Sequence, residues 1–276
     1  MKTRKWLRRL LVLALLAGLV LAALDDRLIV RRYAIEAEEL SASVRLAVLT
    51  DFHEEDYGEG AAVLLEAVAA EEPHLVLLVG DMFADGGDFS YAAGLMRALA
   101  ADYPTYYVTG NHEYWTDQID HITALVQDAG VTVLDQACEV VSVNGQQLAL
   151  CGVPDPYAMV YAGAPDTPVQ LAHAMAGAPG GLCTVLMAHR PELIEKYAAA
   201  GFDLVLSGHA HGGQVRIPLL LNGLCAPNQG WFPAYAGGLY TREDTTLIVS
   251  RGLSRQAQWY VPRIFNRPEL VIVDLK

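Results

Sequence analysis

Short apolar runs alternate with amphipathic stretches from Leu46 onward, and this alternation is the strongest constraint on the fold. It is typical of β-α-β units around a largely parallel sheet, so the sequence predicts an α/β fold. We expect strands at residues 46–50, 75–79, 106–109, 184–188 and 204–207, and helices at 59–71, 89–101, 116–129 and 192–199. Further strands are predicted near 28–37, 247–249 and 270–273.

An antiparallel hairpin inside this set is predicted by Asn144-Gly145, which lies between the alternating runs 138–143 and 146–152. A two-residue turn there places Cys138 directly opposite Cys151, at a non-hydrogen-bonded pair where β-carbons come closest. Two interpretations stay open: a cross-strand disulfide, or two buried apolar thiols, which we favour. None of the four cysteines forms a C-x-x-C motif, so neither a zinc knuckle nor a redox dithiol is predicted.

The N-terminal segment carries an uninterrupted apolar run of 15 residues from Leu10 to Leu24, preceded by Trp6 and Leu7. A spanning helix needs about 20 apolar residues, and a signal-peptide core has about 7 to 15. We favour a retained membrane anchor over residues 6–24, because no clean A-x-A cleavage site follows and Arg8 and Arg9 can snorkel. The alternatives are secretion after signal cleavage and, less favoured, a buried helix of the core.

Charge is distributed unevenly along the chain. The first nine residues contain five basic ones, and the remaining chain carries 14 basic and 32 acidic residues, a formal charge of −18. Because positive charge stays on the cytoplasmic side, we expect a cell-membrane protein with an anchor at 1–26 and one catalytic domain at 27–276 on the extracytoplasmic face. A body this acidic repels a phosphate backbone, so no nucleic-acid partner is predicted, and the oligomeric state is left open.

Residues of the metal-ligand type follow five of the predicted strands. They are Asp51 and His53, Asp81, Asn111, His189, and His209 with His211. Since active sites of α/β sheets lie outside the carboxyl ends of parallel strands, we expect these sets to converge. The mixed nitrogen and oxygen donors favour two divalent or trivalent ions of Mn, Zn or Fe that share a carboxylate. The other histidines, His74, His121 and His173, are expected to be ordinary surface or hydrogen-bonded residues.

The ordered blocks D-x-H, G-D, G-N-H-E, H and G-H-A-H resemble those of the calcineurin-like metallophosphoesterases, in particular a membrane-associated bacterial branch. Residues 152–156 and the tail at 235–240, 250–252 and 267–269 resemble the same branch. The resemblance implies a four-layer α-β-β-α sandwich and a two-metal hydrolase of phosphomonoesters or phosphodiesters. Position by position it implies Asp51, His53 and His211 at one metal, Asn111, His189 and His209 at the other, and Asp81 between them.

The same resemblance implies direct attack on phosphorus by a hydroxide held between the metals. His112 would be the non-ligand histidine at the scissile phosphate, with Asp85 as the candidate to orient it. A domain tethered close to a bilayer favours an envelope or lipid-linked phosphate as substrate. The alternative function is a membrane-tethered metal-binding protein without turnover; neither a P-loop nor a G-x-S-x-G nucleophile motif offers another chemistry.

Overall fold

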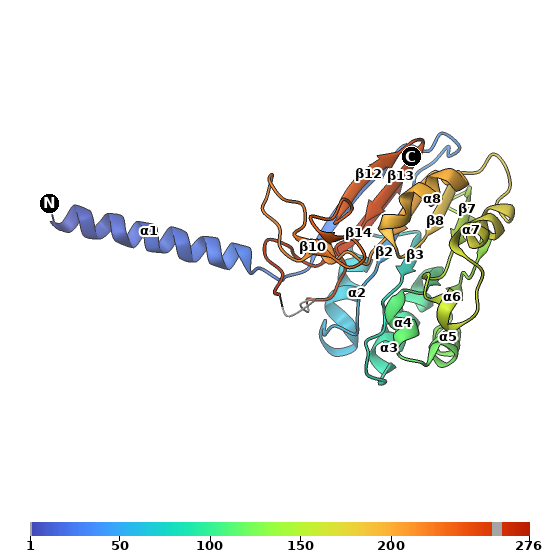
Figure 1. Ribbon diagram of the computed structural model, residues 1–276, viewed down its shortest axis with the longest axis horizontal. Helices are drawn as coiled ribbons and strands as arrows, with labels where there is room; N and C mark the ends of the chain where they lie inside the picture. Colours follow the sequence, from blue (N-terminus) through green and yellow to red (C-terminus); the bar gives the residue numbers. More distant parts are fainter. Residues whose placement is uncertain (1, 256–260) are drawn as a thin grey trace.

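Helix α1 (Lys2–Ala23) projects away from the rest of the chain in the computed structural model, which describes residues 2–255 and 261–276 (Figure 1). At 1.5 Å per residue its 22 residues span about 33 Å, roughly the thickness of a bilayer core. From Arg4 to Ala23 it is apolar and long enough to cross a membrane, and that stretch is not buried against the protein. The helix begins eight residues before the predicted apolar run, because it includes the basic segment 2–9. Since its apolar stretch is not buried against the protein, the interpretation as a buried core helix is wrong.

The first sheet contains the strands that start and end the chain after α1. Its order is β1 (Ile29–Ile35), β14 (Glu269–Leu275), β2 (Val44–Leu49), β3 (Leu75–Val79), β4 (Thr105–Val108) and β5 (Thr132–Val133). Strands β2 to β5 run parallel, whereas β14 runs antiparallel to β2 and parallel to β1. The parallel strands bring residues 50, 80 and 109 to one edge of this sheet.

The second sheet has the order β12 (Gly238–Arg242), β13 (Thr245–Val249), β9 (Leu204–Ser207), β8 (Thr184–Met187), β7 (Gln146–Gly152) and β6 (Ala137–Val143). The four central strands are parallel, and both edge strands are antiparallel to their neighbours. A separate two-stranded pair, β10 (Cys225–Ala226) and β11 (Gly230–Trp231), lies in the loop-rich stretch before β12. The predicted strands are confirmed, and each begins and ends within two residues of the predicted position.

Alternate residues of each strand point into different cores, which produces four layers. In β2, Leu46 and Val48 pack between the two sheets, while Ala47 and Leu49 face the helices outside the first sheet. Those helices are α2 (Ala62–Ala69), α3 (Ser90–Asp102) and α5 (Ile119–Asp128). A third core packs the second sheet against α7 (Thr167–Ala176) and α8 (Ile194–Ala200), so the predicted α-β-β-α sandwich is confirmed.

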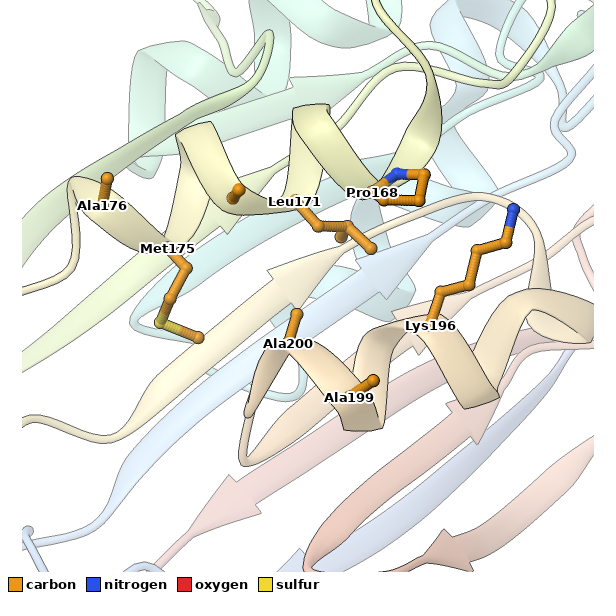
Figure 2. A pocket seen from close by; sticks show the side chains of 8 residues that line it. Pro168, Leu171, Met175, Ala176, Lys196, Ala199 and Ala200 are labelled. Atoms are coloured by element: carbon orange, nitrogen blue, oxygen red, sulfur yellow. The ribbon is translucent and has the colours of Figure 1, made fainter.

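Helix α7 was not expected from the sequence, although it begins with ordinary capping chemistry. The Asp166 carboxylate accepts a hydrogen bond from the Val169 amide at 3.2 Å, and Pro168 lies in the first turn. Helices α7 and α8 leave an apolar groove of about 540 Å³ between them, into which Leu171 and Met175 point from one side and Ala199 from the other (Figure 2). Short helices α4 (Asn111–Trp115) and α6 (Ala158–Tyr161) complete the set described here.

The predicted hairpin is present as β6 and β7, with Cys138 paired to Cys151 in register. The two sulfurs form a disulfide, so the favoured interpretation as two thiols is wrong. Cys151 is buried but Cys138 is only half-buried, and the close approach of opposed β-carbons that the register provides is what allows the bond. Cys183 and Cys225 are buried free thiols.

Candidate metal centre

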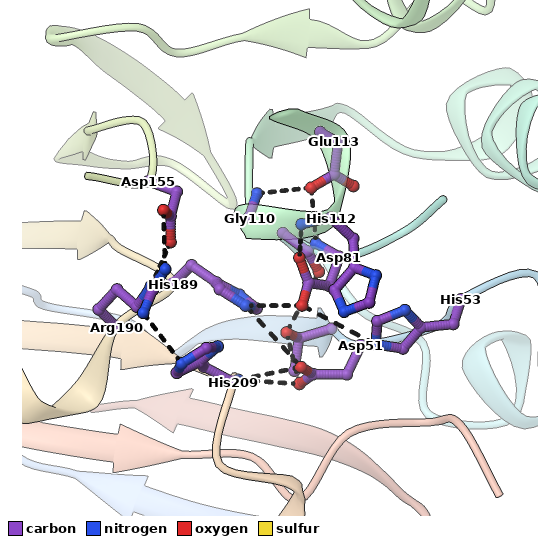
Figure 3. A network of polar contacts seen from close by, with 12 residues as sticks. Asp51, His53, Asp81, Gly110, His112, Glu113, Asp155, His189, Arg190 and His209 are labelled. Atoms are coloured by element: carbon purple, nitrogen blue, oxygen red, sulfur yellow. Dashed lines mark hydrogen bonds and ion pairs between the residues drawn. The ribbon is translucent and has the colours of Figure 1, made fainter. Parts of the chain in front are cut away.

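The carboxyl ends of the parallel strands in both sheets meet at one edge of the sandwich, where the predicted aspartate and histidine ligands lie together. Figure 3 shows Asp51, His53, Asp81, His189 and His209 at this place. Asp51 follows β2, Asp81 follows β3, and Asn111 begins helix α4 after β4. From the second sheet, His189 follows β8, and His209 and His211 follow β9. All seven predicted ligands are buried or nearly so.

Five of these ligand residues have a left-handed backbone, which non-glycine residues adopt only at a cost of about 1–3 kcal/mol each. The residues are Asp51, His53, Asp81, His209 and His211, with φ between 46° and 65°. Such conformations persist where the surrounding structure imposes them, and they cluster at functional sites. In each of the five residues this conformation accompanies a side chain that belongs to one of the two predicted ligand groups.

Two glycines allow the ligand loops to come this close. A β-carbon at Gly110 would overlap the carboxylate of Asp81, and one at Gly208 would overlap Thr50 and the carboxylate of Asp51. Glycine is therefore required in G-N-H-E and G-H-A-H, because the first packs closely against Asp81 of the adjacent strand loop and the second against Asp51 of the other sheet.

The ligand atoms form two groups that share Asp81. One group is Asp51, His53, Asp81 and His211, the other is Asp81, His189 and His209, and within each group the ligand atoms lie within 4.8 Å of one another. Oδ2 of Asp81 lies 3.1 Å from Nε2 of His189 and 3.8 Å from Nε2 of His53. The arrangement fits two ions bridged by one carboxylate.

Buried polar atoms without hydrogen-bond partners support this interpretation. Among the described residues, neither Oδ1 of Asn111 nor Nε2 of His53 has a hydrogen-bond partner, and both atoms are shielded from solvent. A buried polar atom with no partner costs free energy, so its retention indicates a ligand. Imidazole, carboxylate and amide donors in this mixture suit Mn, Zn or Fe, and the residues present therefore fit two such ions.

Hydrogen bonds fix which atom each ligand presents. The Nδ1–H of His189 donates to the carbonyl of Val79 at 2.8 Å, so Nε2 is the nitrogen that faces Asp81. The Asp51 carboxylate accepts from the His209 amide at 3.0 Å and from the Thr50 hydroxyl at 2.9 Å. Partners of this kind orient metal ligands and raise metal affinity.

A buried ion pair supports His209 from behind. Arg190 and Asp155 form a bidentate pair, and Nη1 of Arg190 also donates to Oδ1 of Asn228 at 2.5 Å. The same Asn228 oxygen accepts from Nε2 of His209 at 2.8 Å, and Arg190 lies 3.1 Å from that nitrogen. Nδ1 of His209 is thereby left as the ligand atom. The sequence analysis assigned no role to these supporting residues; the only signal was Asp155 within the stretch 152–156.

Glu113 connects two of the ligand loops. Its buried carboxylate accepts four backbone N–H bonds, from Gly110 at 2.7 Å, Met82 at 2.8 Å, Asp81 at 3.1 Å and Phe83 at 3.3 Å. The G-D and G-N-H-E loops are therefore held together by one side chain. Sequence reasoning quoted this glutamate within its block and missed its role.

Electrostatics differ between the ligands. Burial lowers the pKa of His53 to about 3 and holds those of His209 and His211 well below the usual value, so these rings are neutral. Burial raises the pKa of Asp51 to about 6. Burial also acts to lower the pKa of His189, but Asp81 and Asp51 outweigh it and raise that pKa to about 10 in the metal-free protein.

His112 lies beside the ligands without belonging to either group. Its amide donates to Oδ1 of Asp81 at 2.9 Å, and its ring contacts that of His53 with centroids 4.4 Å apart. Nδ1–H of His112 donates to Asp85 at 2.8 Å, so the longer G-D-M-F-A-D spacing still brings these two together. His74, His121 and His173 belong to neither ligand group: His74 accepts from the Arg45 amide at 2.8 Å, and His173 contacts Gln136 at 3.3 Å.

Comparison with known proteins agrees with this geometry. The family model described as calcineurin-like phosphoesterase matches residues 44–213. An uncharacterised metallophosphoesterase of Helicobacter pylori is 30% identical over 87% of this chain and 61% of its own length. The phosphodiesterase YaeI of Escherichia coli is 28% identical over 85% of this chain and 83% of its own length.

A bovine relative is named transmembrane protein with metallophosphoesterase domain; it is 29% identical over 85% of this chain and 53% of its own length. The chain thus spans about half to three fifths of the length of several relatives it matches. Among solved structures, the NAD nucleotidase NadN of Haemophilus influenzae has a TM-score of 0.52 at 16% identity, covering 76% of this chain and 45% of that one. That likeness concerns the fold alone.

Proposed function

Because this chain belongs to the calcineurin-like phosphoesterase family, we propose that it is a membrane-anchored, two-metal hydrolase of phosphoesters. The observation that carries the proposal is the pair of buried ligand groups that share Asp81. Residues 1–26 would form the anchor and residues 27–276 the catalytic domain. Asp51, His53 and His211 would hold one ion, Asn111, His189 and His209 the other, and Asp81 would bridge them.

When bound, the two ions would lower the pKa of a water molecule and neutralise the phosphoryl oxygens of the substrate. The chain's own residues perform the rest. His53, His209 and His211 are already neutral, so they can bind the ions without losing a proton. The Glu113 carboxylate holds the loops of Asp81 and Asn111 together.

His112 is the candidate general acid at the leaving oxygen. Donation of Nδ1–H to Asp85 leaves Nε2 as the nitrogen available to a substrate. Asp85 acts through His112 and is therefore a positioning residue. The ring of Trp115, 4.6 Å from that of His112 between centroids, packs against it and limits its movement.

A phosphodiester substrate in the cell envelope is supported by three observations. YaeI, which matches most of this chain, is named a phosphodiesterase. Helix α1 has the length and composition of a membrane span. The Cys138–Cys151 disulfide fits an oxidising compartment outside the cytoplasm. A lipid-linked phosphate close to the bilayer is the substrate class that satisfies all three.

The test is a substrate panel on the full chain in detergent, loaded separately with Mn, Zn, Fe or Mg. We expect hydrolysis of bis(p-nitrophenyl) phosphate above that of p-nitrophenyl phosphate, with about two ions bound per chain by elemental analysis. Folded protein that binds both ions and hydrolyses neither compound nor any phospholipid would favour the alternative, a metal-binding protein without turnover.

A further inference from the structure

Five large apolar side chains are exposed together in the stretch that follows ligand His211. We call them the apolar rim: Ile217, Leu219, Leu220, Trp231 and Phe232. Leu219 is fully exposed, Leu220 is 84% exposed, and the two aromatic residues are close to 70% exposed. Single exposed apolar residues are normal, but five of them in two adjoining segments of one loop region point to an interaction site.

Backbone contacts bring the rim together and place it beside the metal centre. The loop from Gln214 to Gly223 closes on itself at its base, where the Leu224 amide donates to the carbonyl of Gly213 at 2.8 Å. Strand β11 then carries Trp231 beside Cys225, and the Phe232 amide donates to the Leu224 carbonyl at 2.7 Å. The rim therefore extends directly from the turn that holds His211.

The end of helix α1 is tied to the same place by residues 264–267, which we call the clamp. The Arg216 amide donates to the carbonyl of Ile264 at 2.9 Å, and the Phe265 amide donates to the carbonyl of Ala23 at 2.7 Å. The side-chain amide of Asn266 donates to the carbonyl of His211 at 2.8 Å. Figure 1 shows the loops around β10 at the edge of the molecule from which α1 projects.

Behind the rim lies a cluster of arginines, in a chain whose remainder is strongly acidic. Arg251 and Arg31 lie 3.5 and 3.9 Å from the one buried glutamate among them, Glu269. Arg263 donates to the carbonyl of Arg251 at 2.7 Å, and its Nε and Nη1 have no hydrogen-bond partner among the described residues. Arg216 belongs to the rim loop itself, where it donates to Asn222. Of these arginines, the partly exposed Arg31 and Arg216 can reach phosphate headgroups above acyl chains, whereas Arg251 and Arg263 are largely buried.

We propose that the apolar rim inserts into the bilayer that α1 crosses, so that the domain is seated on the membrane at two adjacent points. The inference rests on the proposed role of α1 as an anchor, and it narrows the substrate to a phosphoester of a lipid at the membrane surface. A bilayer is the occupant because the rim is continuous with the end of a membrane-spanning helix and is backed by positive charge. The apolar groove between α7 and α8 has neither property.

Insertion is tested directly with the full chain reconstituted in vesicles of phosphatidylcholine and phosphatidylglycerol. An environment-sensitive fluorophore is attached at Leu219→Cys and, as the matched control, at Val160→Cys, a 76% exposed apolar position on α6. Labelled wild-type protein corrects for Cys183 and Cys225, which are buried. We expect blue-shifted emission and strong quenching by acyl-chain nitroxide lipids at position 219 alone.

Water-like emission at position 219, equal to that at 160, would overturn the proposal. Energy transfer between labels on two chains, in place of quenching by lipid, would assign the rim to a second copy and overturn it as well.

A second variant separates this inference from the proposed function. Leu220→Asp, combined with the label at 219, should return the emission toward that of water and leave turnover of soluble bis(p-nitrophenyl) phosphate within about twofold, because Leu220 is 84% exposed and lies outside both ligand groups. Unchanged emission in this variant would overturn the insertion. Absence of turnover with every metal would contradict the proposed hydrolase function, but it would not affect the fluorescence test of membrane insertion.

Discussion

The two halves of the candidate centre use similar ligands but are supported in different ways. In the half that contains Asp51 and His53, backbone hydrogen bonds supply much of the support: the Ser254 amide donates to the carbonyl of Asp51 at 2.7 Å, and the His53 amide donates to the carbonyl of Asp81 at 3.1 Å. In the half that contains His209, the support is the buried Arg190–Asp155 pair. Main-chain support tolerates side-chain substitution, whereas a buried charge pair does not. The second half should therefore be the more fragile one.

The largest effect is expected where the halves meet. Asp81→Asn removes the shared carboxylate charge, so we expect both ions to be lost and turnover to fall to background. Elemental analysis and bis(p-nitrophenyl) phosphate hydrolysis measure the two effects. Retention of one ion per chain would show that the halves are independent and that Asp81 does not bridge them.

His112 belongs to neither half and provides the control for chemistry without metal loss. We expect His112→Asn to slow turnover by about 10² to 10⁴-fold, the scale of a lost general acid, with metal content unchanged. Asp85→Asn should slow turnover less, with metal content unchanged, because an asparagine oxygen can still accept the hydrogen bond that orients the ring. Loss of metal in the His112 variant would place this histidine among the ligands.

The difference in support is tested by the double variant Arg190→Met with Asp155→Leu, which removes both charges and leaves neither unpaired. We expect affinity at one of the two sites to fall about 10- to 100-fold, the usual effect of losing partners that orient a ligand, with the other site unchanged. Competitive metal titration resolves the two. Equal weakening at both sites would contradict the division into halves.

Proton release should distinguish the halves more finely. His189, with its pKa raised to about 10, carries a proton at pH 8 that binding must displace, so affinity in the second half should fall about tenfold for each unit below pH 10. His53, lowered to about 3, carries none, and the first half should weaken only below about pH 6, where Asp51 takes up a proton. Calorimetry in two buffers at pH 8 should detect about one proton for one ion and none for the other. Equal release would contradict the assignment.

The smallest effect on the centre is expected from the disulfide, which lies in the edge hairpin of the second sheet. Cys138→Ser with Cys151→Ser should lower the free energy of unfolding by about 2–4 kcal/mol and leave metal content and turnover unchanged. Urea unfolding of the double variant, compared with disulfide-intact wild type, is the measurement, and reduced wild type should match the variant. A change in metal binding would connect this edge to the centre.

The sequence predicted the regular part of the sandwich and every proposed ligand. Apolar runs that end in glycine or aspartate, such as 75–79 and 204–207, define a strand and its polar loop within one stretch of chain. The supporting residues were missed because their partners are distant in sequence: Arg190 lies 35 residues from Asp155 and 38 from Asn228. The sequence alone does not show that Arg190 and Asp155 are buried, so their pairing could be recognised only from the fold.

Two other features escaped prediction for local reasons. Between residues 214 and 268, glycine and proline interrupt the hydrophobic pattern, so neither strand β12 nor the loop that carries the rim had a periodic signal. The disulfide was judged from the register alone, which is the same for a bond and for two thiols. The predicted pairing of Cys138 with Cys151 was confirmed, and the favoured interpretation as two free thiols was wrong.

If α1 and the apolar rim seat the domain on a bilayer, as proposed above, the clamp at residues 264–267 has a kinetic consequence. Three consecutive residues, 264 to 266, are hydrogen-bonded to the rim loop, the end of α1 and His211, and these bonds restrain the domain relative to its tether. Encounter with a lipid then becomes lateral diffusion in two dimensions, in which tethering sets the local concentration. Its rate should follow the number of substrate molecules per unit area of membrane, and dilution of the vesicles at constant lipid composition should leave turnover unchanged.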